Sequence, residues 1–436
     1  MTARPYRALR YRDFRWLWLA QLVSLTGTQM QTVAIHWHVY LLTRSPLALG
    51  LVGLTRVVPV IVFSLWGGVV ADRHDRRWVM FTAQGVMAVG SVILAALTFA
   101  GQETLASLYL LNALLAAASA FENPARQALI PRLVPREDLP GALSLNLTMF
   151  HASLIGGPAL AGLLIAGSAA RFVPGPHLGA GSAGATASLA QIYTLNALSF
   201  LGVLTALLIM RTSGKTEAPA GVPEPPLQAL KAGLRFVLTT PIMVWTMGLD
   251  FFATFFAGSL SLLPIFADQV LHVGPAGYGW LVAAPAVGAL LGALYTSVRP
   301  LPRRHGRVLL YAVAAYGFST VIFGLSRSFL LTLLALAVSG LADLVSTVIR
   351  QTLRQLITPD GLRGRMTSVN MIFFIGGPQL GELEAGLVAS LFASAVVGVT
   401  VSVASGGVAT ILAGAAVALA TPIVRNYELA GHVGTP

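Results

Sequence analysis

The chain has 436 residues, of which 56% are hydrophobic and 10% charged, with no cysteine and a net charge of +12. Soluble domains carry about 25% charged residues, so this composition indicates an all-α polytopic membrane protein and argues against a soluble enzyme. The absence of cysteine excludes disulfides, thiolate metal sites and cysteine nucleophiles.

Twelve apolar segments are each long enough to cross a bilayer, which requires about 20 residues. In chain order they are Trp16–Leu41, Leu47–Ala71, Trp78–Ala100, Leu105–Ala125, Pro140–Ala166, Leu189–Met210, Pro241–Ala267, Tyr278–Val298, Val308–Leu325, Phe329–Ile349, Met366–Leu391 and Val396–Pro422. Because residues 1–15 are polar and the first segment is long, we expect a retained signal-anchor rather than a cleaved signal peptide.

The basic residues lie almost entirely on one side of these segments. All but four of the 28 Lys and Arg residues share the side of the N-terminus, the exceptions being Arg44, Arg171, Arg327 and, inside the second segment, Arg56. Connections rich in Lys and Arg stay in the cytoplasm. We therefore expect a bacterial inner-membrane protein with both termini cytoplasmic, surrounded by the lipid bilayer and without a nucleic-acid partner.

A long connection, residues 212–240, separates the sixth segment from the seventh. It begins with a Pro-rich stretch and continues through Leu227–Leu238, whose leucines recur at helical spacing beside Lys231 and Arg235. This pattern predicts an amphipathic helix along the inner interface. The chain then divides into an N-terminal six-helix bundle (1–211), this linker, and a C-terminal six-helix bundle (241–436).

The two halves repeat each other in sequence. Arg126-Gln127-x-Leu129 matches Arg350-Gln351-x-Leu353 at an offset of 224, and Gly156-Gly157-Pro158 matches Gly376-Gly377-Pro378 at an offset of 220. Matches at nearly one offset in different segments indicate a duplicated, pseudo-symmetric bundle. Duplicated halves in transporters place a substrate site near the midplane, between the repeats.

The short connection between the second and third segments concentrates charge. It reads Gly68-x-x-x-Asp72-Arg73-x-x-Arg76-Arg77, and its arginines mark a cytoplasmic edge. The spacing resembles the signature loop of the major facilitator superfamily, although Asp75 stands where that family has Gly.

This resemblance implies a cytoplasmic gate in which Asp72 pairs with Arg126 of the fourth segment, together with Gly68, Arg73, Arg76 and Arg77. The alternative is a charged membrane stop without a gating role. In the second half, Thr296 stands at the position of Asp72, so we expect a weaker clamp there.

The resemblance covers nearly the full chain and narrows to the drug-and-siderophore exporter branch, which includes the enterobactin exporter and macrolide efflux pumps. It rests on Arg44-Ser45-Pro46, Pro124-Ala125-Arg126 and Gly364-Arg365-Met366-x-Ser368-Val369-Asn370. The fifth segment also holds Gly157, Pro158 and Gly162, which partly match a glycine motif of antiporters; ordinary small-residue packing is the alternative.

Ionisable side chains inside apolar segments are costly and mark function. Asp250, Glu122 and Asp343 lie on segments seven, four and ten, which the resemblance implies line a central cavity. We expect one of them to carry the proton, and Asp250 first, because no basic residue lies near it in the sequence. For Glu122 and Asp343 the alternative is an ion pair with Arg126 or Arg350.

Arg56 and Glu382 are further cavity candidates: Arg56 is expected to neutralise an acid, meet an anionic substrate or make a structural pair. Glu382 and Glu384 are two residues apart and therefore face different sides of their helix. His36 and His38 lie near the outer end of the first segment, where we favour placement at the membrane interface over a titrating role.

These features predict a monomeric, proton-coupled exporter of hydrophobic or amphipathic small molecules, such as drugs, macrolides or siderophores, working by alternating access. A uniporter or importer is one alternative; a non-transporting protein, such as a lipid scramblase or a scaffold, is the other. The sequence contains no Walker motif and no recognisable nucleophile–base set, so we expect no enzymatic activity, no cofactor and no metal.

Overall fold

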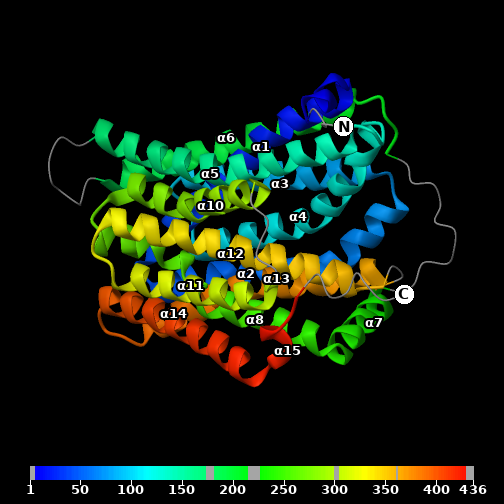
Figure 1. The fold of residues 1–436 in the computed structure, drawn as a ribbon. Helices are drawn as coiled ribbons and strands as arrows, with labels where there is room; N and C mark the ends of the chain where they lie inside the picture. The colour runs from blue at the N-terminus through cyan, green and yellow to red at the C-terminus, as the bar shows by residue number, and fades with distance from the viewer. Residues whose placement is uncertain (1–4, 173–180, 215–225, 299–303, 360–361, 429–436) are drawn as a thin grey trace. The chain divides into compact units, whose positions relative to one another are not determined.

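The computed structural model describes residues 5–172, 181–214, 226–298, 304–359 and 362–428. In these ranges every regular element is a helix, which confirms the all-α fold class. Contacts divide the chain into two compact units, each a helical bundle (Figure 1). The first unit holds residues 1–43, 55–226 and 274–279, and the second holds residues 44–54, 227–273 and 280–436.

The first half of the chain forms six long helices after a short 3₁₀ helix, η1 (Pro5–Arg10). They are α1 (Arg12–Thr43), α2 (Pro46–Arg73), α3 (Arg76–Phe99), α4 (Leu105–Leu133), α5 (Leu139–Phe172) and α6 (Gly181–Ile209). A separate helix, α7 (Pro226–Thr239), covers the range in which the leucine spacing predicts an amphipathic helix.

The second half begins with α8 and continues to the short helix α15. Its elements are α8 (Pro241–Phe256), η2 (Leu260–Leu262), α9 (Leu263–Ile265), η3 (Phe266–Val270), α10 (Gly274–Val298), α11 (His305–Leu325), α12 (Phe329–Ile357), α13 (Arg363–Ser390), α14 (Ala395–Ala420) and α15 (Pro422–Arg425).

Ten helical stretches in the described ranges are long and apolar enough to cross a membrane: α2 to α6, the stretch from α8 to η3, α10 to α12, and α14. The two remaining predicted segments fall on α1 and α13, which have 32 and 28 residues and thus exceed the length that a bilayer requires. Polar side chains, such as Gln31 in α1 and Glu382 in α13, make these two helices less apolar than the others.

The helices of the two units pack in the same pattern. In the first unit, α1 packs against α5 and α6, and α3 packs against α4 and α6. In the second unit, α8 packs against α13 and α14, and α11 packs against α12 and α14. The offset of the sequence repeat makes α8, α11, α12, α13 and α14 the equivalents of α1, α3, α4, α5 and α6. The internal duplication is therefore present in the packing as well as in the sequence.

The repeated Gly-Gly-Pro motif makes an equivalent close contact in each unit. A Cβ atom added to Gly157 would lie 2.9 Å from the carbonyl oxygen of Thr26 in α1, and one added to Gly377 would lie 3.2 Å from that of Phe251 in α8. A Cβ atom on Gly156 would meet nothing within 4 Å. The second glycine of each motif therefore lets two helix backbones approach closely.

The seventh predicted segment is not one continuous helix. α8 ends at Phe256, and the chain continues through η2, α9 and the π-helical turn η3. Gly258 lies at this break, where an added Cβ atom would be 2.8 Å from the Cα atom of Gly381 in α13. The prediction of a single helix over Pro241–Ala267 is wrong in this respect, because hydropathy reports apolar length and not the continuity of the backbone.

Each unit has its own apolar core. In the first unit, Met80, Leu129 and Leu207 belong to one cluster of buried side chains. In the second unit, Leu249, Leu309 and Ile349 belong to another, which joins α8, α11 and α12. The charged side chains described below are therefore held by helices whose apolar faces are packed.

Candidate functional site

Asp250 of α8 contacts an arginine of α12. Its Oδ1 atom lies 2.6 Å from the Nη2 atom of Arg350, and the two side chains are only 12% and 11% exposed. Asp250 has no basic neighbour in the sequence, but the fold supplies one from a distant helix. The sequence therefore correctly shows no local basic partner for Asp250, but the folded chain places Arg350 beside it.

Arg350 is held by other groups of its own helix. It donates to the Oγ atom of Ser346 and, at 2.9 Å, to the Oγ1 atom of Thr347. Asp343 Oδ1 lies 4.0 Å from Arg350 Nη2, and the side chain of Asp343 is 45% exposed. Asp250 is thus the closer and more buried of the two acids that face Arg350.

A second buried ion pair lies in the first unit, on α4. Arg126 Nε is 3.0 Å from Glu122 Oε1, and the side chains are 8% and 6% exposed. The same carboxylate oxygen accepts hydrogen bonds from Gln21 Nε2 at 3.2 Å and from Gln84 Nε2 at 3.5 Å. Glu122 and Arg126 thus form the ion pair that the sequence analysis gave as the alternative to a proton-carrying role for Glu122.

The two arginines occupy equivalent positions of the repeat, but the acids that neutralise them do not. Ser346 stands where the first unit has Glu122. The ion pair of the first unit therefore lies within α4, whereas that of the second unit links α8 to α12. A change in the charge of Asp250 consequently acts on a contact between two helices.

The arginines between α2 and α3 have different surroundings. Arg76 Nη1 donates to the carbonyl oxygen of Ala128 in α4 at 3.1 Å. Arg77 donates at 3.0 and 2.9 Å to two carbonyl oxygens at the end of α6, whereas Arg73 is exposed. Cations near helix C-termini neutralise unpaired carbonyls and the partial negative charge there. Arg76 and Arg77 thus fasten the loop to helices of their own unit.

Asp75, the departure from the signature loop, has a structural role. Its Oδ1 atom accepts a hydrogen bond from the backbone N–H of Arg77 at 3.0 Å, and Asp75 is the N-cap of α3. Asp is among the best N-cap residues. The side chain of Asp72 and the surroundings of Gly68 lie outside the part of the chain that the structure describes, so the predicted pairing of Asp72 with Arg126 stays a prediction.

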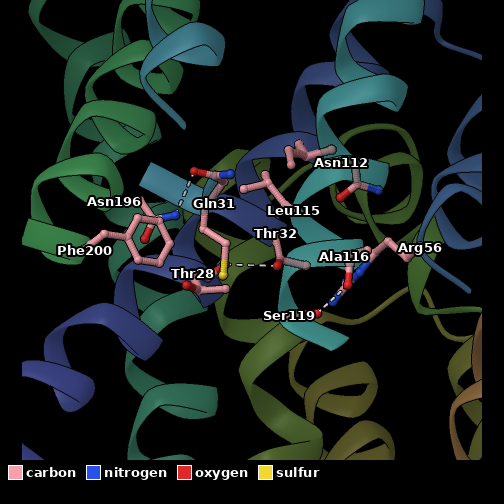
Figure 2. A pocket seen from close by; sticks show the side chains of 12 residues that line it. Thr28, Gln31, Thr32, Arg56, Asn112, Leu115, Ala116, Ser119, Asn196 and Phe200 are labelled. Atoms are coloured by element: carbon pink, nitrogen blue, oxygen red, sulfur yellow. Dashed lines mark hydrogen bonds between the residues drawn. The ribbon is translucent and has the colours of Figure 1, made fainter. Parts of the chain in front are cut away.

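A polar pocket opens within the first unit (Figure 2). About 60 Å³ is available there to the centre of a water molecule, and a single water needs about 10–15 Å³ by this measure. The lining residues are Thr28, Gln31, Thr32, Ile35, Arg56, Met87, Asn112, Leu115, Ala116, Ser119, Asn196 and Phe200. Amides and hydroxyls thus alternate with apolar walls, and Arg56 is the charged side chain among them.

The amide side chains of this pocket are ordered by hydrogen bonds. Asn196 of α6 donates to Gln31 Oε1 at 2.8 Å, and Ser91 donates to the same oxygen at 2.9 Å. On the other side of the pocket, Asn112 of α4 donates to Thr55 Oγ1 at 2.9 Å. Sequence reasoning missed these residues because they carry no charge; uncharged amides inside apolar segments were the available signal.

The predicted motif of the fifth segment lies where α5 meets α1 and residues 274–279, which also belong to the first unit. Pro158 is inside α5, and Gly157 faces α1 as described above. A Cβ atom on Gly162 would lie 2.9 Å from the Cα atom of Gly279 and 2.6 Å from the carbonyl oxygen of Pro275. Small-residue packing, one of the two interpretations of the motif, describes these contacts.

Comparison with known proteins decides the family. Residues 3–430 match the family model described as transmembrane secretion effector. The chain belongs to this transporter family. The enterobactin exporters EntS of Shigella boydii serotype 18 and of Escherichia coli O81 are each 26% identical to it over 373 residues, covering 86% of this chain and 84% of theirs. The chain is thus a transporter of the major facilitator superfamily and is related to an enterobactin exporter.

Solved structures show the same fold for this transporter. A bacterial homologue of the human lysosomal transporter Spinster, in an inward-facing and occupied conformation, superposes with a TM-score of 0.73 at 16% identity and covers 96% of this chain and 99% of its own. The nucleoside transporter NupG superposes with a TM-score of 0.69 at 14% identity, covering 96% and 100% of the two chains.

Four more residues named in the sequence analysis have defined positions in this transporter. Arg56 lines the pocket of the first unit. In the second unit, an atom of Glu382 would lie 2.6 Å from a Cβ atom added to Gly53, so this acid packs against α2. His36 and His38 are 7% and 2% exposed, so both side chains are buried within the bundle; their placement at the membrane interface stays a prediction.

Proposed function

We propose that this transporter is a proton-coupled exporter of hydrophobic or amphipathic small molecules and that it works by alternating access. The observation that carries the proposal is the buried contact of Asp250 with Arg350. A carboxylate is the group that binds and releases a proton, and here its charge links two helices. We place the protein in a bacterial inner membrane as a monomer with both termini in the cytoplasm.

The coupling follows from the cost of an unpaired charge. Removing one partner of a buried ion pair costs about 3–5 kcal/mol, because the other charge stays buried. When Asp250 takes up a proton, Arg350 retains Ser346 and Thr347 as neutral acceptors and Asp343 at 4.0 Å. Proton binding therefore favours an arrangement of α8 and α12 in which Arg350 turns toward Asp343 or toward water.

The polar pocket of the first unit supports an amphipathic substrate. Gln31, Asn112 and Asn196 offer hydrogen bonds, while Ile35 and Phe200 offer apolar surface. Small-molecule sites combine such apolar walls with a few positioned polar groups. The related exporters are named for enterobactin, so a siderophore belongs among the substrates to be tested, beside a macrolide and a cationic dye.

The test uses the full-length protein in proteoliposomes with an imposed pH gradient. Movement of enterobactin, erythromycin and ethidium is measured for the wild type and for Asp250→Asn. We expect the wild type to move at least one of them against its concentration gradient, and the variant to bind it without uphill movement. Movement only down the concentration gradient would indicate a uniporter, and movement of none would contradict the exporter proposal.

A further inference from the structure

Three titratable side chains of the first unit meet away from the Glu122–Arg126 ion pair of the same unit. They are His38 of α1, Glu103 of the connection between α3 and α4, and Tyr193 of α6. The Nδ1 atom of His38 lies 3.1 Å from the Oη atom of Tyr193, and its Nε2 atom lies 3.6 Å from Glu103 Oε1. His38 is 2% exposed and Tyr193 is fully buried.

This cluster lies at the end of the unit opposite to the arginine-rich loops. α3 starts at Arg76, beside those loops, and ends at Phe99, just before Glu103. The neighbours of Glu103 in the chain, Gln102 and Thr104, are exposed, while the side chain of Glu103 itself is only 10% exposed. Glu103 thus lies between the surface at this end of the bundle and the deeper His38.

Two buried polar atoms of the cluster lack a hydrogen-bond partner among the described residues: His38 Nε2 and Glu103 Oε2. The separation of 3.6 Å between His38 Nε2 and Glu103 Oε1 is longer than a hydrogen bond, for which about 2.7–3.2 Å is usual. Leaving a buried polar group unpaired costs about 1–3 kcal/mol. An imidazole nitrogen and a carboxylate oxygen thus face each other in a buried setting without a hydrogen bond between them.

Either the ring nitrogen or the hydroxyl can donate in the contact between His38 Nδ1 and Tyr193 Oη. In the tautomer in which Nδ1 donates, Nε2 of the neutral ring presents a lone pair toward Glu103, and two acceptors face each other. One added proton on Nε2 turns this contact into a charge-assisted hydrogen bond, which is shorter and stronger than a neutral one. The imidazole becomes imidazolium, the carboxylate stays ionised, and the pair becomes neutral overall.

We propose that His38 and Glu103 form a proton-binding site, open toward the end of the first unit opposite to the arginine-rich loops, with Tyr193 holding the ring. Among the described residues, the titratable groups that face His38 are Glu103 from the α3–α4 connection and Tyr193 from α6. Its neighbour on the same helix, His36, directs Nδ1 to the carbonyl oxygen of Thr32 at 2.9 Å. The proposed site does not include Asp250 and does not require that transport be proton-coupled.

The test follows the ring nitrogens of ¹⁵N-histidine-labelled, full-length protein in lipid vesicles by NMR as the pH is varied, without substrate or gradient. The signal of His38 is identified by its loss in His38→Gln. We expect it to report one protonation step, and we expect Glu103→Gln to lower the midpoint of that step by about 1–3 pH units, since an opposite charge at this distance has an effect of that size.

Matched variants separate this effect from a loss of fold. His36→Gln and Glu137→Gln, the latter an exposed acid at the other end of the unit, should leave the midpoint of His38 unchanged. Tyr193→Phe keeps the ring buried but removes the hydroxyl that contacts Nδ1, and should also move the midpoint. A midpoint unaffected by Glu103→Gln, or a His38 that takes up no proton between pH 4 and 9, would overturn the proposal even if coupled transport is demonstrated.

Discussion

Asp250 Oδ1 of α8 lies 2.6 Å from Arg350 Nη2 of α12. Arg126, the equivalent of Arg350 in the first unit, instead pairs with Glu122 of its own helix, α4. Both units thus have the arginine at the equivalent position, but the acid that pairs with it comes from the same helix in the first unit and from another helix in the second. The ion pair of Glu122 lies within α4, although the same carboxylate also accepts hydrogen bonds from Gln21 of α1 and Gln84 of α3. The ion pair of Asp250 itself joins two helices, α8 and α12, and for this reason we propose Asp250 rather than Glu122 for proton coupling.

The first prediction concerns variants that transfer the acid beside Arg350 from α8 to α12. Asp250→Asn leaves the charge of Arg350 buried and should lower the stability of the protein by about 3–5 kcal/mol. Adding Ser346→Glu places a carboxylate four residues before Arg350, as Glu122 precedes Arg126. The double variant should recover much of the lost thermal stability in detergent or lipid, measured as the unfolding temperature.

Transport measurements on the same variants separate the contribution of Asp250 to stability from its proposed role in proton coupling. The double variant has a neutral α8, so its recovered stability should not restore uphill movement of substrate. The control is Ser346→Glu alone, which supplies a second acid to a paired arginine and should stabilise little. If Asp250→Asn unfolds no more readily than the wild type, the ion pair contributes nothing to the packing of α8 and α12.

The second prediction concerns the close approach of helices at the Gly-Gly-Pro motifs. Gly157→Ala forces a methyl group against the backbone of α1 and should destabilise the protein by about 1–3 kcal/mol, as overpacking does. Gly156→Ala, at the adjacent residue, adds a methyl group into open space and should be tolerated. Equal unfolding temperatures for the two variants would show that α1 and α5 adjust freely.

The third prediction concerns the pocket of the first unit. Ala116 lines it and the next residue, Ala117, does not. Ala116→Leu should fill part of the pocket and raise the KM for a transported substrate about tenfold, which corresponds to about 1.4 kcal/mol, with little change in unfolding temperature. Ala117→Leu is the matched control. An unchanged KM in Ala116→Leu would place the substrate elsewhere.

The fourth prediction concerns the loop between α2 and α3. Arg77→Gln removes two hydrogen bonds to the end of α6 together with a favourable charge, and should cost about 0.3–2 kcal/mol. Arg73→Gln, at an exposed side chain, should cost less. Thermal unfolding of both variants in the same lipid decides this, and a larger loss in Arg73→Gln would contradict the structural role of Arg77.

Much of the fold could be predicted from the sequence because the helices differ from their connections in hydropathy. The twelve predicted segments all coincide with helical stretches, and the repeat that joins Gly157 to Gly377 was visible as a repeated motif. The break after Phe256 was not visible, because α8, η2 and α9 are equally apolar. At this break Gly258 lies close to α13, a contact between distant segments.

The candidate site was predicted less completely, for a similar reason. Local spacing led to the pair of Glu122 with Arg126, since four residues form one helical turn. It did not lead to Arg350 as the partner of Asp250, because nothing in the sequence states which face of α12 meets α8. The amides of the pocket and the burial of His38 likewise depend on packing between helices.

Proton movement driven by substrate tests the central claim most directly. Full-length protein is reconstituted in vesicles that contain a pH-sensitive dye, and a substrate found in the panel is added on one side without a pH gradient. The account predicts that the wild type moves protons opposite to the substrate, and that the folded double variant Asp250→Asn, Ser346→Glu moves none. Substrate-driven proton movement that persists in the double variant would contradict the assignment of coupling to Asp250.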